Sequence, residues 1–400
     1  MHLSHIKLVN FRGFKELDLD LHPGVTVLMG GNAQGKTTIL EAIYLLAIAR
    51  SFRAENEREL VNWQAGESLE QTFVDATMFG ADGRYRVIVG YRPIQGHRAS
   101  PSANTRNART HSVRKEVRVG GVRRTASDLV GLFNVVLFSA EDIELVQGSP
   151  SLRRRYLDIL ISQADPTYLK TLQRYQKVLQ QRNQLLKLLS ERRANEDELD
   201  FWDGELVREG AWITNQRTLA IASVAALARS QHLELTHGRE ELAVDYRPSV
   251  AADGGPASAE AAYRTLLLAS RRRELALGAT VVGPHRDDFK LLVDGVDMGL
   301  YSSRGQARTL ALTLRLSEAA FLAGARGAPV VLLDDVLSEL DPNRRRQVLQ
   351  RALSYEQTLI TATDLDAFPT DFLANARILK VDQGAVSSLV QPVQAPHPGA

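Results

Sequence analysis

The chain has 400 residues, of which 44% are hydrophobic and 24% charged, with a formal net charge of +2 and no cysteine. This length predicts a globular protein with two or more packed units, and the lack of cysteine excludes disulfides and thiolate zinc sites. We find no secretory segment and no apolar run close to the ~18 residues of a membrane span, so we expect a cytoplasmic protein without a membrane partner.

The N-terminal segment has the pattern of an α/β unit. Leucines alternate with aspartates between Leu17 and Leu21, as in a half-exposed strand. Residues 25–29 are apolar and largely β-branched, which favours a buried strand, and residues 38–49 carry apolar side chains at helical spacing. The sequence therefore predicts a buried strand followed by an amphipathic helix, with a glycine-containing loop between them.

This loop has the full pattern G-x-x-x-x-G-K-[ST] of a phosphate-binding loop. Its glycines allow backbone N–H groups to wrap phosphate oxygens, Lys36 reaches the β- and γ-phosphates, and the Thr37 hydroxyl is placed to hold Mg²⁺. The sequence therefore predicts that the chain binds a nucleoside triphosphate. The predicted contacts are Gly30, Gly31, Asn32, Ala33, Gln34, Gly35, Lys36, Thr37 and Thr38.

A basic, β-rich segment follows. Residues 72–79 and 85–92 alternate like the strands of a hairpin around a turn at 81–83. Between Arg84 and Arg124 positive side chains far outnumber acids, which is the electrostatic pattern of a surface that binds a polyanion. Residues 95–112 lack periodicity and predict a mobile loop. The alternative is that the segment is a solvated arginine-rich loop without a ligand.

From residue 149 to about 276 the periodicity becomes helical. Two apolar stripes, at 172–189 and 202–227, recur at helical spacing, and we expect them to pack against each other as core. A helix of about 27 residues is only about 40 Å long, so the insert predicts a helical lobe and not a long coiled-coil arm. We therefore expect an α/β unit made of two halves, residues 1–148 and 277–390, with a helical insert at 149–276 between them. Residues 391–400 are expected to form a disordered Pro-rich tail.

A second apolar strand, Val330–Leu333, ends in two carboxylates. A buried parallel strand of this kind delivers the side chains at its C-terminal end to the edge of the sheet where ligands bind. Asp334 then suits the coordination shell of Mg²⁺. Asp335 is one residue further on and can polarise a hydrolytic water as a general base.

Ser303, Gly305 and Gln306 precede a long helical run at 307–324. Free N–H groups and the helix dipole make an anion site at such a helix N-terminus, although the serine alone also predicts an ordinary N-cap. The pattern does not stand alone, because Ser338–Asp341 follows the carboxylates and Thr361–Asp364 follows a further apolar run.

Along the chain, the features follow in the order phosphate loop, helical insert, Ser-x-Gly-Gln, paired carboxylates and Ser-x-Leu-Asp. With this order of motifs the chain resembles the ABC-type ATPase heads. The resemblance implies a mixed α/β head that binds ATP with Mg²⁺, and two heads that enclose two ATP molecules between them. By this resemblance Ser303, Gly305 and Gln306 act on the ATP of a second copy, and Asp341 belongs to the loop at the dimer contact.

Further motifs are Asn10–Arg12, Ser51–Arg53, Ser149–Pro150, Arg153–Asp158, Gly283–Asp288 and Ser303–Gln306. With them the whole chain resembles the RecF family of bacterial recombination and repair ATPases. That resemblance implies an ATP-dependent homodimer on single- and double-stranded DNA at gaps and junctions, with slow, DNA-stimulated ATP hydrolysis. It also implies work with RecR and RecO to load RecA and support the SOS response. Arg12 is a candidate phosphate contact, with a plain surface arginine as the alternative.

Other functions share parts of this pattern. A soluble ATPase subunit of another DNA or chromosome maintenance complex has the same head, whereas a transporter subunit needs a surface for membrane helices, which the basic flank and the helical insert argue against. A small-molecule P-loop kinase needs a substrate lid and stays monomeric when nucleotide is added. Stimulation of hydrolysis by duplex DNA separates the DNA-binding ATPase from both the transporter and the kinase.

Overall fold

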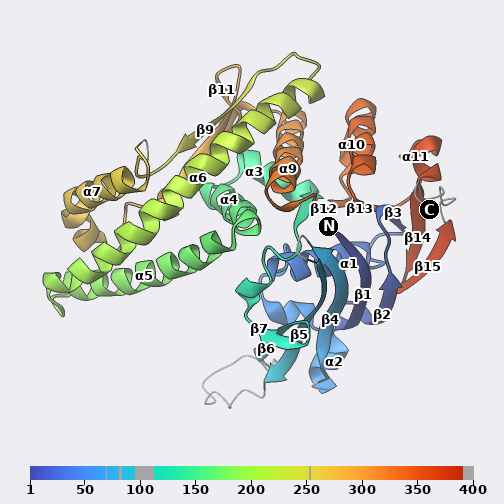
Figure 1. Ribbon diagram of the computed structural model, residues 1–400, viewed down its shortest axis with the longest axis horizontal. Coiled ribbons are helices and arrows are strands. Elements are labelled where there is room, and N and C mark those ends of the chain that lie inside the picture. Colours follow the sequence, from blue (N-terminus) through green and yellow to red (C-terminus); the bar gives the residue numbers. More distant parts are fainter. Residues whose placement is uncertain (69, 81–82, 95–111, 252–253, 391–400) are drawn as a thin grey trace, which may run out of the picture. The chain divides into compact units, whose positions relative to one another are not determined.

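The computed structural model of the protein describes residues 1–68, 70–80, 83–94, 112–251 and 254–390. The chain forms two compact units, one from Met1–Ala140 together with Leu322–Ala400 and the other from Glu141–Phe321 (Figure 1). The predicted mobile loop at 95–112, except Ser112, and the predicted tail at 391–400 lie outside the described residues.

The first unit contains a six-stranded sheet in the order β15-β14-β3-β13-β12-β8. All neighbouring strands in it run parallel except β15, which is antiparallel to β14. The strands predicted at 25–29 and 330–333 are confirmed as β3 and β12, and β13 lies between them. The strands are β3 (Gly24–Met29), β8 (Val135–Ser139), β12 (Val330–Asp334), β13 (Gln357–Ala362), β14 (Ala376–Asp382) and β15 (Ala385–Val390).

A second sheet of the same unit is antiparallel throughout, in the order β2-β1-β4-β5-β6-β7. The predicted hairpin of residues 72–79 and 85–92 is confirmed as the pair β4 and β5, because Gly80 and Gly83 pair at its closed end. The strands are β1 (His2–Phe11), β2 (Phe14–Asp20), β4 (Thr72–Gly80), β5 (Gly83–Ile94), β6 (Ser112–Val119) and β7 (Val122–Arg124).

Helix α1 (Lys36–Ile48) follows β3 and the phosphate-binding loop. Every residue from Thr38 to Ile48 is buried, so the prediction of a one-sided amphipathic helix is wrong. The reason is that α1 contacts strands of both sheets, β12 and β13 as well as β4 and β5, and a helix packed in this way has no solvent-facing side. The other helices of this unit include α2 (Trp63–Ser68), α10 (Pro342–Ser354) and α11 (Thr370–Ala374).

The second unit is mainly helical and has a three-stranded sheet in the order β11-β10-β9. Its strands are β9 (Leu242–Arg247), β10 (Asp288–Val293) and β11 (Val296–Asp297). Its helices are α3 (Glu144–Gln147), α4 (Pro150–Ala164), α5 (Pro166–Ser190), α6 (Leu199–Leu235), α7 (Pro256–Leu277), α8 (Met298–Tyr301) and most of α9 (Arg304–Arg326).

Helix α6 has 37 residues and is longer than the roughly 27 residues that the sequence predicts. At 1.5 Å per residue it is about 55 Å long. The helix continues because its buried side extends past residue 227, where Ala228, His232 and Leu235 are also in the core. Helix α5 packs against α6, so the expected contact between the two apolar stripes is confirmed.

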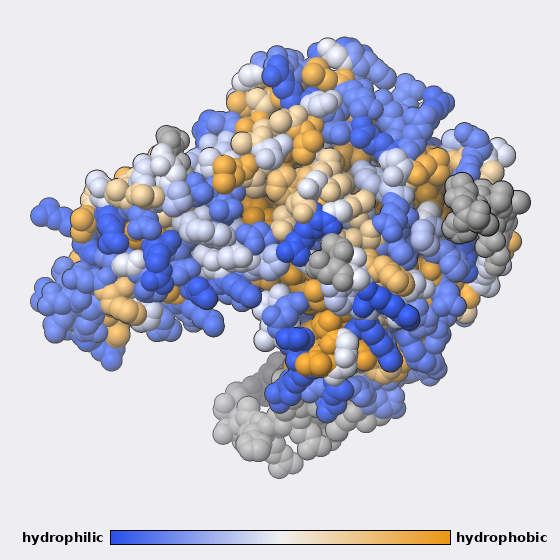
Figure 2. All heavy atoms as spheres, viewed as in Figure 1, coloured by the Kyte–Doolittle hydropathy of each residue, from blue (hydrophilic) through white to orange (hydrophobic). Residues whose placement is uncertain are grey.

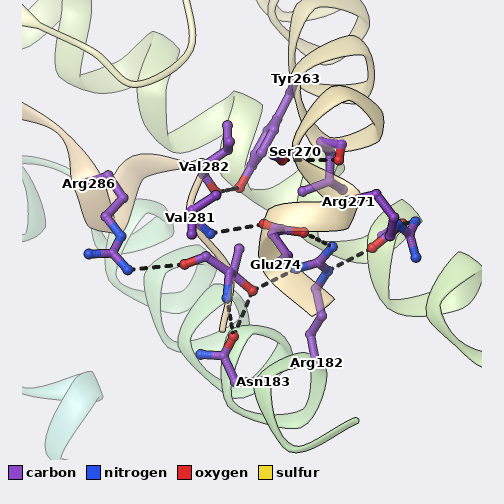
Figure 3. Close-up of polar contacts among 12 residues, drawn as sticks. Arg182, Asn183, Tyr263, Ser270, Arg271, Glu274, Val281, Val282 and Arg286 are labelled. Atoms are coloured by element: carbon purple, nitrogen blue, oxygen red, sulfur yellow. Dashed lines mark hydrogen bonds and ion pairs between the residues drawn. The ribbon is translucent and has the colours of Figure 1, made fainter. Parts of the chain in front are cut away.

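A buried ion cluster joins α5, α6 and α7 (Figure 3). Arg182 is fully buried and donates hydrogen bonds to Asp203 at 2.7 Å, to Glu274 at 2.6 Å and to the Thr280 hydroxyl at 2.7 Å. Glu274 also accepts the backbone N–H of Val281 at 2.9 Å. Burial disfavours the charge on Arg182, but its hydrogen bonds to the two carboxylates raise its pKa above the usual value. The three helices are thus joined by buried charges, and removing one partner would leave an unpaired buried charge that strongly lowers the stability of the fold.

A second buried cluster brings together two motifs that lie far apart in the sequence. Arg217 donates to Asp158 on α4 at 2.8 Å and to Asp287 at 2.9 Å, and it is almost completely buried. Arg153 of α4 holds Asp288 through two hydrogen bonds of 2.7 and 3.0 Å. The motifs Arg153–Asp158 and Gly283–Asp288 therefore form one structural element of the second unit, in which charge pairing fixes α4 against the strand β10.

The surface in view over α5 and α7 is mostly hydrophilic, with small separate hydrophobic areas (Figure 2). Leu268 and Leu277 of α7 are exposed, and single exposed leucines are ordinary in globular proteins. Among the helices that the structure describes, none combines the length and the apolar character needed to cross a membrane.

Candidate nucleotide-binding site

The phosphate-binding loop borders a cavity of about 750 Å³ in the first unit. The loop follows the carboxyl end of β3, and because β3, β13 and β12 are parallel, their carboxyl ends meet at the same edge of the sheet. The cavity is lined by residues 32–38 of the loop and, among others, by Arg12, Arg53, Trp63, Asp335 and Thr361. The topology thus brings the predicted loop and the predicted carboxylates together.

Two glycines of the loop are fixed by their surroundings. A Cβ atom on Gly30 would lie 2.2 Å from the carbonyl oxygen of Val381, so no larger residue fits there. Gly35 has φ of +110°, and a Cβ atom on it would lie 2.7 Å from the ring of Phe14. The glycines therefore serve the close packing of the loop against β14 and the start of β2, in addition to leaving N–H groups free for a ligand.

The side chain of Lys36 closes the loop. Its Nζ donates to the carbonyl oxygens of Gly30 at 2.6 Å and Gly31 at 2.7 Å. Burial lowers the pKa of Lys36, and the carboxylates of Asp335 and Asp334 oppose that effect. An ammonium carries three hydrogens, so one donor remains to meet a phosphate oxygen at the mouth of the loop.

Asp334 is tied to the loop by a single oxygen. Its Oδ1 accepts the hydroxyl of Thr37 at 2.8 Å and that of Thr361 at 2.9 Å. Burial raises the pKa of Asp334, and the two hydroxyl donors partly offset this. The two predicted metal-binding residues, Thr37 and Asp334, are therefore direct neighbours. Thr361 of β13, which the sequence did not indicate as a site residue, donates to the same oxygen of Asp334.

Asp335 lines the cavity and has an unusual backbone. Its φ is +53°, in the left-handed region that aspartate tolerates better than most residues. Its N–H donates to the Thr361 hydroxyl at 2.9 Å. The Ser338 hydroxyl lies 2.9 Å from the main-chain oxygen of Asp335 and 3.2 Å from its carboxylate, so the two oxygens share this donor. The turn after β12 thus directs Asp334 and Asp335 differently, with Asp334 bound to the loop and Asp335 facing the cavity.

A buried carboxylate on α1 organises the wall of the cavity. Glu41 is fully buried and accepts two hydrogen bonds from Arg12, at 2.8 and 3.1 Å, one from Ser51 at 2.6 Å and one from Arg53 at 3.0 Å. Burial raises the pKa of Glu41, but these donors outweigh it, so the pKa lies below the usual value. Arg53 also donates to the Thr38 hydroxyl at 3.1 Å. Arg12, a predicted phosphate contact, is thus held by Glu41 while it lines the cavity.

The turn between β14 and β15 also holds the loop. The Gln34 side-chain oxygen accepts the backbone N–H of Gln383 at 2.6 Å, and the main-chain carbonyl oxygen of Gln34 accepts the N–H of Gly384 at 3.3 Å. Ala33 takes a left-handed backbone with φ of +62° beside it. These contacts cross about 350 residues of sequence, so no local pattern could have indicated them.

The serine motif belongs to the second unit and forms a reciprocal cap. The backbone N–H of Gln306 donates to the Ser303 hydroxyl at 3.2 Å, and the N–H of Ser303 donates to the Gln306 side chain at 3.1 Å. This is a capping box at the start of α9, the arrangement that an ordinary N-cap predicts. Gly305 has open space at its Cβ position. Asp341, predicted from the family resemblance alone, caps α10 by accepting the N–H groups of Asn343 and Arg344 at 3.0 and 3.1 Å.

Four arginines of the basic segment lie on one face of the antiparallel sheet in the first unit. Arg92 pairs with Arg114 across β5 and β6, and Arg118 pairs with Arg123 across β6 and β7. Because opposed residues share a face, these four side chains, called here the arginine face, lie on the same side. The carboxylate of Glu116 is 3.5 to 4.0 Å from three of them and leaves a positive surplus.

Lys115 does not belong to the arginine face, although it lies in the basic run of the sequence. It alternates to the other side of β6, where its Nζ binds the Ala49 carbonyl and lies 2.7 Å from Glu57. Its side chain is only 13% exposed. The prediction that the whole run faces a polyanion is therefore wrong at this position, because strand alternation sends every second residue to the opposite face.

Three comparisons place these features among known proteins. The family model RecF/RecN/SMC N terminal domain matches residues 2–385. The "DNA replication and repair protein RecF" of Chloroflexus aggregans is 42% identical over 397 residues, which covers 96% of this chain and 99% of that protein. Two solved structures of the recombination mediator protein RecF, described as RecF-ATPrS and RecF-ATP in the RecFOR pathway, have TM-scores of 0.85 and 0.83. Both are 34% identical to this chain. Each alignment includes 97% of this chain, and it includes 98% of the first RecF chain and 99% of the second.

The head domain of Smc from Pyrococcus furiosus has a TM-score of 0.52 at 16% identity and covers 97% of this chain, a likeness that concerns the fold alone. The family model and the RecF structures, together with the phosphate-binding loop and the carboxylates at the end of β12, define the class of protein as an ABC-type P-loop ATPase head. Within that class, the family model and the identity over nearly the full length are decisive. The chain belongs to the RecF family.

Proposed function

We propose that the chain is an ATP-dependent DNA-binding protein of recombinational repair and replication restart. The observation that carries the proposal is the hydrogen bond of 2.8 Å between Thr37 and Asp334 beside Lys36, because this is the arrangement of a P-loop ATPase poised around a metal and a triphosphate. A solved structure of RecF with ATP, which is 34% identical to this chain, supports ATP as the nucleotide. The alternative of a transport subunit has no supporting observation.

Mg²⁺ fits this site by the chemistry of its donors. Thr37 and Asp334 offer a hydroxyl and a carboxylate oxygen, and Mg²⁺ in nucleotide sites typically takes one or two protein ligands and fills the rest with phosphates and water. Among the described residues no group of three or more histidines, aspartates and glutamates is arranged to hold a metal, which suits this mode. When bound, the ion neutralises charge that develops on the phosphates.

The hydrolysis step rests on Asp335. A carboxylate that faces the cavity and is held by Ser338 can accept a proton from water, whereas Asp334 is occupied by two hydroxyl donors. Lys36 stabilises negative charge near the β- and γ-phosphates. We infer a weak, DNA-stimulated ATPase that acts as a switch, with ATP binding to form a dimer and hydrolysis to release it.

The dimer is proposed to place Ser303, Gly305 and Gln306 of one copy against the ATP of another, with Asp341 near the contact. The start of α9 has backbone N–H groups that suit an anion, as do other helix N-termini. Ser303 is exposed, so a second molecule can reach it.

Replacing Ser303 with arginine should leave ATP binding by the monomer unchanged and prevent the ATP-dependent dimer, because a bulky side chain then occupies the position of the partner's γ-phosphate. Molar mass in solution, measured with and without ATP and Mg²⁺, checks this. Ser303→Asp is the matched variant, since aspartate caps a helix about as well as serine but repels a phosphate. A normal dimer in both variants would contradict the proposed role of the motif.

We further propose that the arginine face binds the DNA backbone, single- or double-stranded, at gaps or junctions. Its surplus of positive charge suits sequence-independent contact with phosphates. We also carry over from the family that the protein works in the cytoplasm with RecR and RecO to load RecA and support SOS induction. The RecF structures, which are described as belonging to the RecFOR pathway, support this.

Neutralising Arg114, Arg118 and Arg123 together with glutamine should flatten the dependence of log K for duplex DNA on log salt by about 2.7, that is 0.9 for each lost phosphate contact. Affinity titrations over a range of salt concentrations measure this slope. The charge-matched control is the replacement of Lys15, Arg346 and Lys380, which are exposed elsewhere on the same unit. An unchanged slope in the arginine variant, or an equal change in the control, would move the DNA contact to another surface.

A further inference from the structure

An exposed tryptophan shares the cavity of the phosphate-binding loop. Trp63 is 71% exposed and lines this cavity together with residues 32–38. An exposed aromatic side chain that lines a ligand cavity offers a ring face on which a planar group of the ligand can stack. We propose that Trp63 is the platform on which the nucleobase of the bound nucleotide stacks. This inference rests on the proposed binding of ATP.

The backbone around Trp63 is fixed, which a stacking platform requires. The N–H of Arg12 donates to the Leu60 carbonyl at 2.9 Å, and the N–H of Asn62 donates to the Asn10 carbonyl at 2.8 Å. The Asn62 side chain in turn donates to the Arg12 carbonyl at 2.7 Å. The residue before Trp63 is therefore bound at two points to the turn between β1 and β2.

That turn is itself part of the cavity wall. Arg12 and Gly13 line the cavity, and Phe14, the first residue of β2, packs against Gly35 of the loop. Phe14 also lines the cavity, but its side chain is only 2% exposed, so it offers a ligand far less surface than Trp63 does. Trp63 thus begins α2 directly after a residue that is hydrogen-bonded to this turn, and its exposed side chain lines the cavity, while the phosphates are assigned to the loop and Lys36.

Stacking on Trp63 determines which ligands the site is expected to distinguish. Every base has a π-face, so an aromatic platform adds affinity without reading hydrogen-bonding groups, and such stacking typically contributes roughly 10-fold to 100-fold in affinity. Trp63 is therefore expected to favour a nucleoside triphosphate over a triphosphate without a base. It is not expected to separate adenine from guanine.

The composition of the chain makes this contact directly observable. The chain has three tryptophans, and the other two, Trp202 and Trp212, lie on α6 in the second unit. In a variant with Trp202→Phe and Trp212→Phe, the fluorescence of Trp63 alone remains. We expect ATP to quench it and inorganic tripolyphosphate to leave it nearly unchanged, because only ATP brings a base onto the ring.

The deciding measurement is the Kd for ATP and for inorganic tripolyphosphate, by calorimetry, in the full chain and two variants. Trp63→Ala should weaken ATP binding about 10-fold or more with the Kd for tripolyphosphate unchanged, and Trp63→Phe should stay within about threefold of the parent for both. Equal ATP affinity in Trp63→Ala, or an equal loss for both ligands, would overturn the platform. A parent chain that binds neither ligand would instead overturn the proposed nucleotide binding.

Discussion

Lys36→Ala is expected to raise the Kd for ATP by about 100-fold or more, and with it to remove ATP-dependent dimerisation. The ammonium is the point charge beside the β- and γ-phosphates, and charge-assisted hydrogen bonds to phosphate are among the strongest contacts that a loop of this kind makes. Lys36 also bridges the carbonyl oxygens of Gly30 and Gly31, so its loss loosens the loop that presents the backbone N–H groups. Both effects act in the same direction.

Titration with a fluorescent ATP analogue measures this loss of affinity. Lys380→Ala, which removes an exposed lysine from β14 of the same unit, is the control and should bind as the parent does. Thermal unfolding of both variants separates a lost contact from a lost fold. ATP affinity within a few fold of the parent in a folded Lys36→Ala protein would remove the assignment of the loop as the nucleotide site.

Asp335→Asn is expected to keep ATP and Mg²⁺ bound but to slow hydrolysis by about 100-fold or more, which is the range over which a general base contributes. An amide can still accept the hydroxyl of Ser338, yet it is too weak a base to take a proton from water. Asparagine also tolerates a left-handed backbone, so the φ of +53° is not a source of strain in the variant. On gapped duplex DNA the dimer should then form with ATP and fail to dissociate.

The comparison with Asp334→Asn gives this experiment its control. Asp334 accepts the hydroxyls of Thr37 and Thr361, so its replacement should weaken Mg²⁺ binding as well as hydrolysis. Single-turnover hydrolysis and dissociation from gapped DNA are measured for both variants. If Asp335→Asn hydrolyses ATP and releases DNA at the parent rate, Asp335 has no part in the mechanism and another group must activate the water.

Local sequence patterns predicted the elements that carry the phosphates and the acids. The glycines and Lys36 have a spacing that depends on a few neighbouring residues, and β3 and β12 are apolar runs whose ends could be read directly. The β4–β5 hairpin was equally local. The same reading failed for α1, whose apolar periodicity looked one-sided because two polar residues, Thr38 and Glu41, are buried and satisfied in the tertiary structure.

Tertiary structure alone decided which side chains surround the loop. Glu41 draws Arg12 and Arg53 to the cavity, Thr361 joins Asp334, and the Gln383–Gly384 turn clamps Gln34, each across a long stretch of sequence. Strand register decided that Arg114 lies on the arginine face while Lys115 lies on the opposite side, paired with Glu57. Residue spacing along the chain determines contacts within a turn of helix or a hairpin. Contacts between distant segments depend instead on how the sheets and helices pack, and this packing results from many buried side chains together.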